Sequence, residues 1–565
     1  MGKLKTQPET VTQGDLPLER IYRWERERAS QVFLIQPYGG GKVRQWTWAE
    51  AVGESRRMAA YLTAQNWPPG SNVAILAKNC AWWILADIAI WMAGHVSVPI
   101  YASLKPESAR QILEHSEAKA CFLGATEEKE MAGALSAGIL TISLPTATGQ
   151  GTVSWDGIAA RTTPLSESPP RSVSDLATII YTSGTTGMPK GVRHTFGAFT
   201  YNGKALLKYI GLGPEQRVLS YLPLAHIVER MGVEMFSLYL GTAIYFTEGV
   251  ERFVADLQRA RPTIFLSVPR LLEKFQQNVF ARIPERRLAL LFRIPVVSGL
   301  VKRRILAALG LSSVQFAACG AAPLRPEVLR WYRNLGLNLA EGYGMTETLV
   351  THLPAPGTVR PGWVGAAIPG VEARLGEHSE LQIKSPMNLL GYYKNPQATE
   401  DAFLADGFFH TGDVCEIAPD GQLKIIGRLK EQFKTSKGKF VAPAPIEGKL
   451  AAHSEIEGCC VIGAGLSSPF AVVILSEEAQ AHARDSAGRA GVEKSLAAIL
   501  EETNRQLDHH ERLAFIAVGD GAWNIANGFM TPTLKLKRAL IEARYMPRAE
   551  DWEGRHRPVV WEGVE

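Results

Sequence analysis

The chain of 565 residues has no apolar run long enough to cross a membrane. Its most apolar stretch, residues 84–100, contains Asp87 and His95 and is shorter than the roughly 20 residues that a membrane-spanning helix needs. We expect a buried helix followed by a strand in this stretch. The N-terminal sequence MGKLKTQPETVTQGDLP is too polar for a secretory signal.

Cysteine is scarce, and the six cysteines show no C-x-x-C spacing. Cys459 and Cys460 are adjacent, which suits neither a zinc site nor an ordinary disulfide. We therefore expect reduced thiols and a cytoplasmic protein.

Charge of one sign is not in excess. The formal net charge of +5 is small for this length and gives no reason to expect a nucleic-acid partner. Hydrophobic residues make up 46% of the chain and charged residues 21%, as in ordinary folded proteins. The length exceeds what one hydrophobic core usually supports, so we expect two or more domains.

Helical and strand patterns alternate in the first part of the chain. Residues 48–65 have helical spacing, residues 72–78 have the pattern of a short buried strand, and residues 107–124 have that of a helix followed by a strand. This alternation predicts an α/β protein with mainly parallel sheets covered by helices. Residues 145–172, rich in Thr, Ser, Gly and Pro, predict an exposed connection before a strand at residues 176–183.

A domain boundary is expected near Lys430. Residues 430–441 are rich in lysine, and residues 444–453 predict a helix. The predicted division is a large N-terminal domain, residues 1–429, and a smaller α+β domain, residues 430–565, which is long enough to fold around its own core.

A stretch rich in hydroxyl groups and glycine, YTSGTTGMPKG at residues 181–191, has the composition of a phosphate-binding loop. It is not a Walker A loop, because Lys190 follows Pro189 and Gly191 stands where that loop has a magnesium-binding hydroxyl. It follows a predicted strand, a context in which backbone amides can gather around an anion. The alternative is a Ser/Thr-rich surface turn.

Seven motifs occur in order along the chain: YTSGTTGMPKG, YLPLAHIVERM, CGAAPL, EGYGMTET, FFHTGD, IIGRLKEQFKTSKGKFVAP and MTPTLKLKR. Together they resemble the adenylate-forming enzymes, a superfamily that includes acyl-CoA synthetases, luciferases and peptide-synthetase adenylation domains. The resemblance covers about residues 20–545. LPLAHIVER, PTIFLSVPRLLEKF, FKTSKGKFVAP and TPTLKLKR are most similar to long-chain fatty acyl-CoA synthetases.

The resemblance implies two half-reactions. A carboxylate attacks the α-phosphorus of ATP to give an acyl-adenylate and pyrophosphate, and the thiol of CoA then attacks the acyl carbon. ATP, Mg²⁺ and CoA are thereby implied, with a medium- or long-chain fatty acid as substrate. Three alternatives remain. The substrate is an aryl or cinnamyl carboxylate, the acceptor is a carrier-protein thiol, or the protein is a nucleotide-binding scaffold without turnover. The oligomeric state is left open.

By this resemblance the loop holds the β- and γ-phosphates. The hydroxyl donors of the loop are Thr182, Ser183, Thr185 and Thr186. Gly184 and Gly187 let the backbone approach the phosphates closely, and Lys190 supplies a positive charge. Hydrogen-bond donors that are already positioned around the oxygens of the leaving pyrophosphate lower the barrier to adenylation. Mg²⁺ is assigned to Thr186 and Glu347, because hard oxygen ligands suit this ion.

Further motifs are assigned to the nucleoside and the α-phosphate. The adenine-site residues are Gly320, Ala321, Ala322 and Tyr343, with the Tyr343 ring stacked on the base, and Gly344 is assigned to nucleotide binding. Asp413 and Arg428 are assigned to the ribose hydroxyls, with a turn aspartate and a surface arginine as the alternatives. Glu347 has an alternative role as a carboxylate at a helix N-terminus.

Four residues are assigned catalytic roles: Lys535, Thr346, Glu347 and His226. Thr346 would bond the α-phosphate, and Lys535 would neutralise charge as carboxylate and phosphate approach each other. Lys537 is the alternative lysine, although Arg538 lies three positions after Lys535, as an arginine commonly does in relatives. His226 is assigned to the junction of nucleotide and carboxylate pockets, with a structural histidine as the alternative.

The resemblance also implies a mobile C-terminal domain that rotates about Lys430. The segment after this hinge would line the tunnel for the pantetheine arm of CoA, through Lys434, Lys437, Gly438 and Lys439.

Residues 280–309 combine seven basic residues with a single acid, Glu285, and many apolar side chains. Pro284 and Pro295 predict two short helices in place of one long helix. The segment either contacts a membrane surface peripherally, with its cations at anionic head groups, or is a solvated basic face on an ordinary helix pair.

Overall fold

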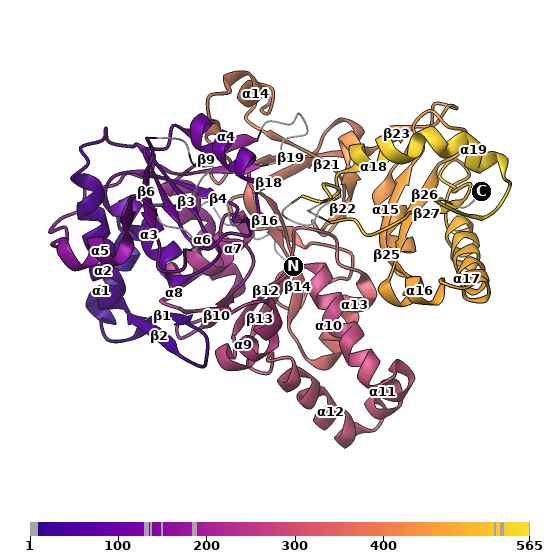
Figure 1. Ribbon diagram of the computed structural model, residues 1–565, viewed down its shortest axis with the longest axis horizontal. Coiled ribbons are helices and arrows are strands. Elements are labelled where there is room, and N and C mark those ends of the chain that lie inside the picture. The colour runs from indigo at the N-terminus through magenta and orange to yellow at the C-terminus, as the bar shows by residue number, and fades with distance from the viewer. Residues whose placement is uncertain are drawn as a thin grey trace. The chain divides into compact units, whose positions relative to one another are not determined.

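The computed structural model describes residues 10–128, 131, 135, 138–147, 151–182, 189–524, 527–531 and 536–563 (Figure 1). The chain divides into two compact units. The larger unit comprises Met1–Ala373, Ile383–Phe409 and Ala418–Leu423, and the smaller unit comprises Arg374–Gln382, His410–Ile417 and Lys424–Glu565. A domain boundary at Lys430 stays a prediction.

The larger unit contains a mainly parallel sheet with the strand order β20-β9-β8-β4-β3-β5-β6-β7. In that order the strands are Gly391–Tyr392, Lys190–Thr195, Leu176–Thr182, Val96–Ile100, Asn72–Leu76, Ala120–Leu123, Leu140–Ser143 and Val153–Ser154. β9 pairs antiparallel with both β8 and β20, and the other described pairs are parallel. The α/β prediction is confirmed, and so are the strands predicted near residues 72–78 and 176–183.

Helices beside this sheet form where the sequence predicts them. α2 (Trp48–Thr63) begins with a capping box in which the Thr47 hydroxyl accepts from the Glu50 amide and the Glu50 carboxylate accepts from the Thr47 amide. α3 (Ala81–Met92) is buried along its whole length and leads into β4, as expected for residues 84–100. α4 (Pro106–Ser116) precedes β5, which confirms the helix and strand predicted at residues 107–124.

The other described strands that lie wholly in the larger unit form three shorter sheets. One has the order β10-β11-β1-β2 and consists of Arg217–Ser220, Ala243–Phe246, Val32–Pro37 and Val43–Thr47. The next is parallel, with the order β12-β13-β14, and consists of Ile264–Ser267, Phe316–Cys319 and Leu339–Glu341. The third is antiparallel, with the order β15-β16-β17, and consists of Tyr343–Met345, Leu349–Leu353 and Ala366–Ala367.

The other helices of the larger unit include the pair predicted from residues 280–309. They are α1 (Pro17–Glu27), α5 (Trp155–Arg161), α6 (Phe196–Ile210), α7 (Ile227–Glu229), α8 (Phe236–Leu240), α9 (Phe253–Ala260), α10 (Pro269–Arg282), α11 (Glu285–Phe292), α12 (Pro295–Ala308), α13 (Pro326–Leu335) and α14 (Pro396–Glu400). Pro284 directly precedes α11 and Pro295 begins α12, so the prolines separate two short helices as predicted.

The prediction of an exposed connection at residues 145–172 is partly wrong. β7 and α5 interrupt it, and Trp155 at the start of α5 is fully buried. The indole N–H of Trp155 donates to the Glu54 carboxylate at 2.7 Å, and Ser154 caps α5 by accepting from the Gly157 amide. One tryptophan and one cap therefore order a segment whose average composition resembles a loop.

The smaller unit is built on a sheet with the order β25-β26-β27-β28. The strands are Ile456–Ile462, Phe470–Leu475, Ile516–Val518 and Val559–Trp561, and the helices are α15 (Pro443–Leu450), α16 (Glu477–His482), α17 (Ser486–Arg505), α18 (Arg538–Tyr545) and α19 (Ala549–Gly554). α15 confirms the helix predicted at residues 444–453. The lysine-rich segment forms a hairpin of β23 (Phe433–Lys434) and β24 (Phe440–Val441).

A further sheet has the order β18-β19-β21-β22, and its residues are divided between the two units. Its strands are Glu372–Leu375, Glu380–Lys384, Phe409–Ile417 and Leu423–Arg428.

The expected absence of a membrane span holds for the described helices, none of which is long and apolar enough to cross a bilayer. All six cysteines lie in described segments, and each is buried and free of disulfides, as predicted.

A buried ion cluster occupies the core of the larger unit at the end of the LPLAHIVER motif, whose last residue is Arg230. Arg230 lies in a short π-helix (Arg230–Met235) and is fully buried. Its guanidinium contacts Asp87 of α3 at 2.5 Å and Glu234 at 3.2 Å, and it donates to the Thr178 hydroxyl of β8 at 2.8 Å. Burial, with the Asp87 carboxylate nearby, holds the pKa of Glu234 well above its ordinary value. One guanidinium is therefore balanced by one carboxylate.

Arg230→Met should lower the free energy of unfolding by about 3–5 kcal/mol, because it leaves buried carboxyl groups without their cation. Urea unfolding measures this. Arg23→Met, which removes an exposed partner of Glu27, is the matched control and should change stability by less than about 1 kcal/mol. Equal effects of the two substitutions would contradict the assignment.

Candidate functional site

The candidate phosphate loop joins two antiparallel strands of the mainly parallel sheet. Thr182, the last residue of β8, pairs with Lys190, the first residue of β9, so these two residues form the base of the loop. The Thr182 hydroxyl lies 3.5 Å from the Lys190 carbonyl oxygen. The loop residues Ser183, Gly184, Thr185, Thr186 and Gly187 lie outside the described residues, and their roles stay predictions.

Lys190 is placed by an aromatic ring that sequence analysis did not single out. Its ammonium lies 4.9 Å from the ring centroid of Tyr392, which is in β20, the strand paired with β9. A cation over an aromatic face is attracted to the electron-rich face of the ring. At the adjacent Gly191, a Cβ atom would meet Ile179 at 2.9 Å, so only glycine fits easily where the strands meet.

Thr346 and Glu347 lie in the turn between β15 and β16. Met345 and Leu349 pair across it, and the Thr348 amide donates to the Met345 carbonyl at 3.2 Å. Leu349 has a φ of 57°, the left-handed conformation that closes a three-residue hairpin loop. Glu347 is therefore in a strained hairpin turn, and the alternative of a carboxylate at a helix N-terminus is excluded.

The Glu347 carboxylate is oriented by the same Tyr392 ring that lies under Lys190. The Tyr392 hydroxyl donates to Glu347 Oε1 at 3.1 Å, and the Leu389 amide donates to the Glu347 carbonyl at 2.7 Å. Burial, followed by the nearby carboxylate, raises the pKa of Tyr392, so the phenol keeps its proton and remains a donor. Tyr392 thus fixes a cation and an anion on neighbouring segments.

Thr346 is held from behind by a buried histidine. His194 of β9 is fully buried, and its Nε2 lies 2.6 Å from the Thr346 carbonyl oxygen. Because a carbonyl oxygen only accepts, the imidazole carries its proton on Nε2. Burial lowers the pKa of His194 to about 4, so the ring is neutral at physiological pH.

His226 forms a helix-capping hydrogen bond, in addition to the role that is predicted for it in the site. It caps α7, with its Nδ1 accepting from the Val228 amide at 3.2 Å, which leaves the proton of a neutral ring on Nε2. α7 packs against β16, the strand that follows the Thr346–Thr348 turn. The structure therefore brings the segments of His226 and Thr346 into contact within the larger unit.

The CGAAPL motif begins at Cys319, the last residue of β13, and lies beside the start of the EGYG motif. A Cβ on Gly320 would lie 3.5 Å from the Gly342 carbonyl oxygen, and the Gly342 amide donates to the Cys319 carbonyl at 2.9 Å. Ala321 has a φ of 68°, a conformation uncommon for a residue with a side chain, and such positions cluster at binding sites.

The two motifs present small residues next to a tyrosine. Ala322 is exposed, and Tyr343 is half-buried with its ring 5.9 Å from that of His352. A Cβ on Gly344 would approach the Leu349 carbonyl oxygen to 2.2 Å, so this position requires glycine. Their roles toward adenine stay predictions.

The smaller unit holds the predicted ribose pair already assembled. Arg428 Nε contacts Asp413 Oδ1 at 3.0 Å, and Arg428 Nη1 donates to the Thr411 carbonyl at 3.1 Å. The Glu380 carboxylate accepts from His410 at 2.7 Å and from the Gly412 amide at 2.9 Å, which fixes the strand just before Asp413. The Asp413 side chain is 6% exposed and that of Arg428 41%.

The predicted hinge and tunnel residues are exposed in the smaller unit. Lys430 lies in a 3-10 turn (Leu429–Glu431), and the Lys434 ammonium lies 4.7 Å from the Phe440 ring centroid across the β23–β24 hairpin. Gly438, with a φ of 72°, is in the hairpin loop. Their functional roles stay predictions.

The predicted catalytic Lys535 lies outside the described residues. Lys537 directly precedes α18, and Arg538 anchors that helix through Glu447 at 2.6 Å and the Val461 carbonyl at 2.7 Å. The choice between Lys535 and Lys537 stays open.

Comparisons with known proteins decide the family. A family model described as AMP-binding enzyme matches residues 21–393, and one described as AMP-binding enzyme C-terminal domain matches residues 430–524. The chain belongs to the AMP-binding, adenylate-forming enzymes.

Curated relatives of this adenylate-forming enzyme include ligases from bacteria and humans. It is 30% identical to the long-chain-fatty-acid–CoA ligase FadD15 of Mycobacterium bovis, over 95% of this chain and 97% of that protein. It is 30% identical to long-chain-fatty-acid–CoA ligase 6 of Homo sapiens, over 85% of this chain and 78% of that protein. The chain is thus an adenylate-forming acid–CoA ligase whose acid these likenesses leave to be identified.

Solved structures show the same fold. The adenylation domain of the carboxylic acid reductase from Segniliparus rugosus, in complex with AMP and a co-purified carboxylic acid, has a TM-score of 0.78 at 23% identity, over 96% of this chain and 95% of that one. An ATP-bound RpMatB-BxBclM chimera has a TM-score of 0.76 at 22% identity, over 94% of this chain and 99% of that one. The predicted architecture, a large domain with mainly parallel sheets and a small C-terminal domain, is confirmed.

The residues present fit a magnesium ion that is held mainly by ATP. No group of three His, Cys, Asp or Glu side chains in the described part of the chain could hold a metal. Mg²⁺ usually keeps several waters and binds through one or two carboxylates together with substrate phosphates. Glu347, oriented by Tyr392, meets this requirement as a single carboxylate.

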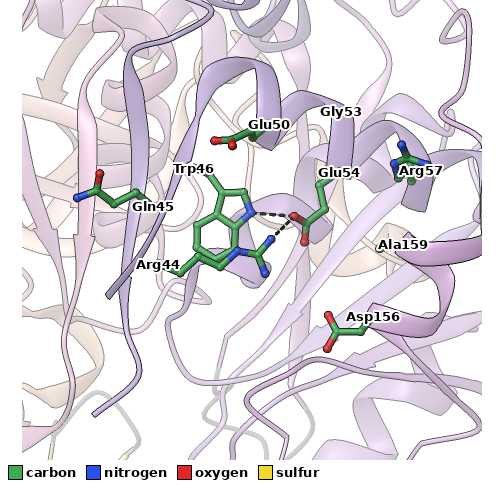
Figure 2. A pocket seen from close by; sticks show the side chains of 9 residues that line it. All are labelled: Arg44, Gln45, Trp46, Glu50, Gly53, Glu54, Arg57, Asp156 and Ala159. Carbon is green, nitrogen blue, oxygen red and sulfur yellow. Dashed lines mark hydrogen bonds and ion pairs between the residues drawn. The ribbon is translucent and has the colours of Figure 1, made fainter. Parts of the chain in front are cut away.

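A pocket of about 410 Å³ lies elsewhere in the larger unit, between β2, α2 and α5 (Figure 2). None of the predicted ATP-site residues lines it. Figure 2 shows the Glu54 carboxylate accepting from Trp46 and Arg44, each at 2.8 Å. Because Glu54 is already used by these side chains and by Trp155, the pocket does not compete as the nucleotide site.

Sequence analysis missed the residues that hold the candidate site in place. His194 and Tyr392 touch Thr346 and Glu347 through contacts that span 152 and 45 residues of chain, so no local pattern reports them. A tyrosine directly after Gly391 on an edge strand was the only available signal.

Tyr392→Phe removes the hydroxyl bond to Glu347 and keeps the ring beneath Lys190. Because the partners that orient a metal ligand commonly affect metal affinity 10–100-fold, the Mg²⁺ concentration for half-maximal ATP–pyrophosphate exchange should rise by about tenfold or more. The neighbouring Tyr393→Phe is the control, since the Tyr393 hydroxyl contacts Asn72 and Glu117 instead. If both variants keep the wild-type Mg²⁺ dependence, Tyr392 does not orient a metal ligand.

Proposed function

We propose that the chain is an ATP-dependent acyl-CoA ligase that activates a medium- or long-chain fatty acid through an acyl-adenylate and transfers the acyl group to CoA in the cytoplasm. The observation that supports the acid most directly is the 30% identity to long-chain-fatty-acid–CoA ligases over 95% of this chain. The LPLAHIVER and TPTLKLKR motifs, similar to that branch, support it further.

In the first half-reaction the larger unit binds the triphosphate. Lys190 compensates charge on the β- and γ-phosphates, and the loop that it ends surrounds them with hydroxyl and amide donors. Thr346 bonds the α-phosphate, with its backbone fixed by the neutral His194. Glu347 would hold Mg²⁺, which would supply positive charge to the triphosphate.

The substrate carboxylate approaches the α-phosphorus while Lys535 compensates the two negative groups. The bond from phosphorus to the bridging oxygen breaks, and pyrophosphate leaves with that electron pair. His226 Nε2–H donates toward the carboxylate, since its Nδ1 is already used by the Val228 amide. Asp413 and Arg428 bind the ribose hydroxyls and thereby position the α-phosphate.

The second half-reaction transfers the acyl group to the thiol of CoA. The sulfur attacks the acyl carbon and AMP leaves. The smaller unit rotates about Lys430 between the two steps, and its Lys434, Lys437, Gly438 and Lys439 line the path of the pantetheine arm.

A pyrophosphate-release assay over acids of different length and aromaticity, with and without CoA, tests the proposal. Release should be fastest with saturated acids of medium or long chain, and thioester should form only when CoA is present. Faster release with aryl or cinnamyl acids would replace the proposed substrate. Adenylation without transfer to CoA would favour a carrier-protein acceptor, and no release with any acid would favour a scaffold without turnover.

Lys535→Ala should slow adenylation by several orders of magnitude, while acyl-adenylate supplied from outside is still converted to acyl-CoA. The charge is needed only while the phosphate and the carboxylate approach each other. ATP–pyrophosphate exchange and single-turnover thioester formation measure the two steps. Lys537→Ala is the control, and a loss of exchange in that variant alone would move the role to Lys537.

Lys430→Pro should leave adenylation within about threefold of wild type and slow thioester formation at least about tenfold, because proline fixes φ near −65°. The Gln432 amide donates to the Arg428 carbonyl across this turn, so the substitution leaves that bond in place. Lys430→Ala keeps the backbone free and is the matched control. Equal losses in both steps would show damage to folding and refute the hinge.

A further inference from the structure

Exposed apolar side chains gather on the helical hairpin formed by α11 and α12. These helices pack against each other, and Figure 1 shows them projecting beyond α10 and α13 of the same unit. Twelve large apolar residues are exposed in the described part of the chain, and four of them are in this hairpin. Those four are Leu290 at 62%, Ile294 at 51%, Val296 at 77% and Leu300 at 60% exposure.

The spacing of these residues gives the hairpin one continuous apolar end. Val296 and Leu300 are four residues apart in α12, so they lie on one side of that helix. Leu290 lies near the end of α11, and Ile294 directly precedes α12. Arg293 and Ile294 connect the helices. The apolar residues therefore surround the tip of the hairpin.

The buried face of the hairpin is a different one. Leu288, Ile305 and Leu309 pack into the core cluster that includes Leu329 and Tyr332 of α13. Because these residues already attach the hairpin to the fold, the exposed apolar residues are not needed for folding.

Arginines flank the apolar tip on both helices. Arg286, Arg287, Arg293, Arg303 and Arg304 are exposed, and none of the five forms an ion pair with another residue in the described part of the chain. Lys302 differs from them, because its ammonium contacts Asn334 at 2.9 Å and lies over the Phe292 ring. The hairpin thus carries free positive charge next to exposed apolar surface.

We propose that the tip of the α11–α12 hairpin inserts into an anionic lipid surface, with Leu290, Ile294, Val296 and Leu300 among the acyl chains and the arginines at the head groups. From Val296 to Arg303 the helix rises by about 10 Å at 1.5 Å per residue. This matches the roughly 5–10 Å depth to which interfacial apolar faces are buried. Arg293 at the tip reaches the head groups by extending its side chain.

The positive charge of the hairpin favours an anionic membrane over a second copy of the chain as its binding partner. Two hairpins placed tip to tip would bring ten unpaired guanidinium groups together, and like charges repel. An anionic membrane accommodates both the apolar tip and the arginines of the hairpin. Each arginine near such a surface gains about 1 kcal/mol of binding free energy.

Co-sedimentation of the full chain with vesicles tests the proposal. Vesicles of equal parts phosphatidylcholine and phosphatidylglycerol should sediment the protein at low salt and release it as salt rises, whereas vesicles of phosphatidylcholine alone should not. Replacing Arg286, Arg287, Arg303 and Arg304 with Glu should weaken binding at least about 100-fold. The triple variant Leu290→Ser, Val296→Ser and Leu300→Ser should weaken it at least about tenfold.

The matched control makes the same change in net charge elsewhere. Arg484, Lys494, Arg512 and Arg557 are exposed residues of the smaller unit, and their joint replacement with Glu should weaken binding by less than about threefold. Circular dichroism and thermal unfolding should be unchanged in all three variants. An equal loss in the control and the hairpin variant would refute the hairpin as the contact, and wild-type protein that stays in the supernatant would refute the proposal.

A fluorescent label reports insertion directly. All six native cysteines are buried, so Leu290→Cys can be labelled selectively with an environment-sensitive dye. Its emission should shift to the blue with the anionic vesicles, and the same dye on Val43→Cys, a site 39% exposed on β2, should not shift. A shift at Val43 without one at Leu290 would overturn the proposal. So would binding to heparin without binding to vesicles, or salt-dependent dimerisation without either.

Discussion

The fully buried guanidinium of Arg230 is the interaction on which the larger unit depends. It joins α3 through Asp87, the sheet through Thr178 of β8, and its own π-helix through Glu234. The rings of Trp83, Trp91 and Phe199 lie within 5.6 Å of it, so the charge is shielded from water by aromatic side chains. A buried cation left without its partners is costly, so these three elements keep one arrangement.

The candidate site depends on this arrangement through His194. The ring of His194 stacks near Phe199, and the Arg230 charge adds to burial in lowering the pKa of His194. A neutral imidazole with its proton on Nε2 can donate to the Thr346 carbonyl without bringing a further charge to the phosphates. The π-helix contributes a geometric constraint, because a Cβ on Gly232 would meet Leu266 of β12 at 1.9 Å. π-Helical turns frequently occur at functional sites, and this one directly follows His226 and α7.

Local patterns in the sequence predicted the elements that are decided locally. α2 has helical spacing and a capping box, and β3 and β8 are short apolar runs, as expected for strands buried on both faces of a parallel sheet. The motifs also predict which residues belong to one site, and that assignment stays a prediction. Where composition was averaged over a long segment, as at residues 145–172, a single buried tryptophan was enough to make the prediction wrong.

Contacts between distant segments could not be predicted in this way. Asp87 and Arg230 are 143 residues apart, and nothing near either residue indicates its partner. The same holds for Tyr392, whose two contacts with Lys190 and Glu347 exist only because β20 pairs with the edge of the sheet at β9. The turn at Glu347 was also ambiguous, since an acid after a threonine suits a helix start as well as a hairpin. The pairing of β15 with β16 decides between them.

The smaller unit shows why preassembly matters for the proposed ribose site. Arg428 and Asp413 neutralise each other before any ribose is bound, and Thr411 fixes both, accepting from Arg428 with its carbonyl and from the Asp413 amide with its hydroxyl. A carboxylate has about four lone-pair positions and can accept from several donors, so the ion pair with Arg428 is compatible with the proposed bonds to the ribose hydroxyls. Since the side chains are already ordered, binding does not have to supply the entropy of ordering them, and more of the interaction energy remains to position the α-phosphate.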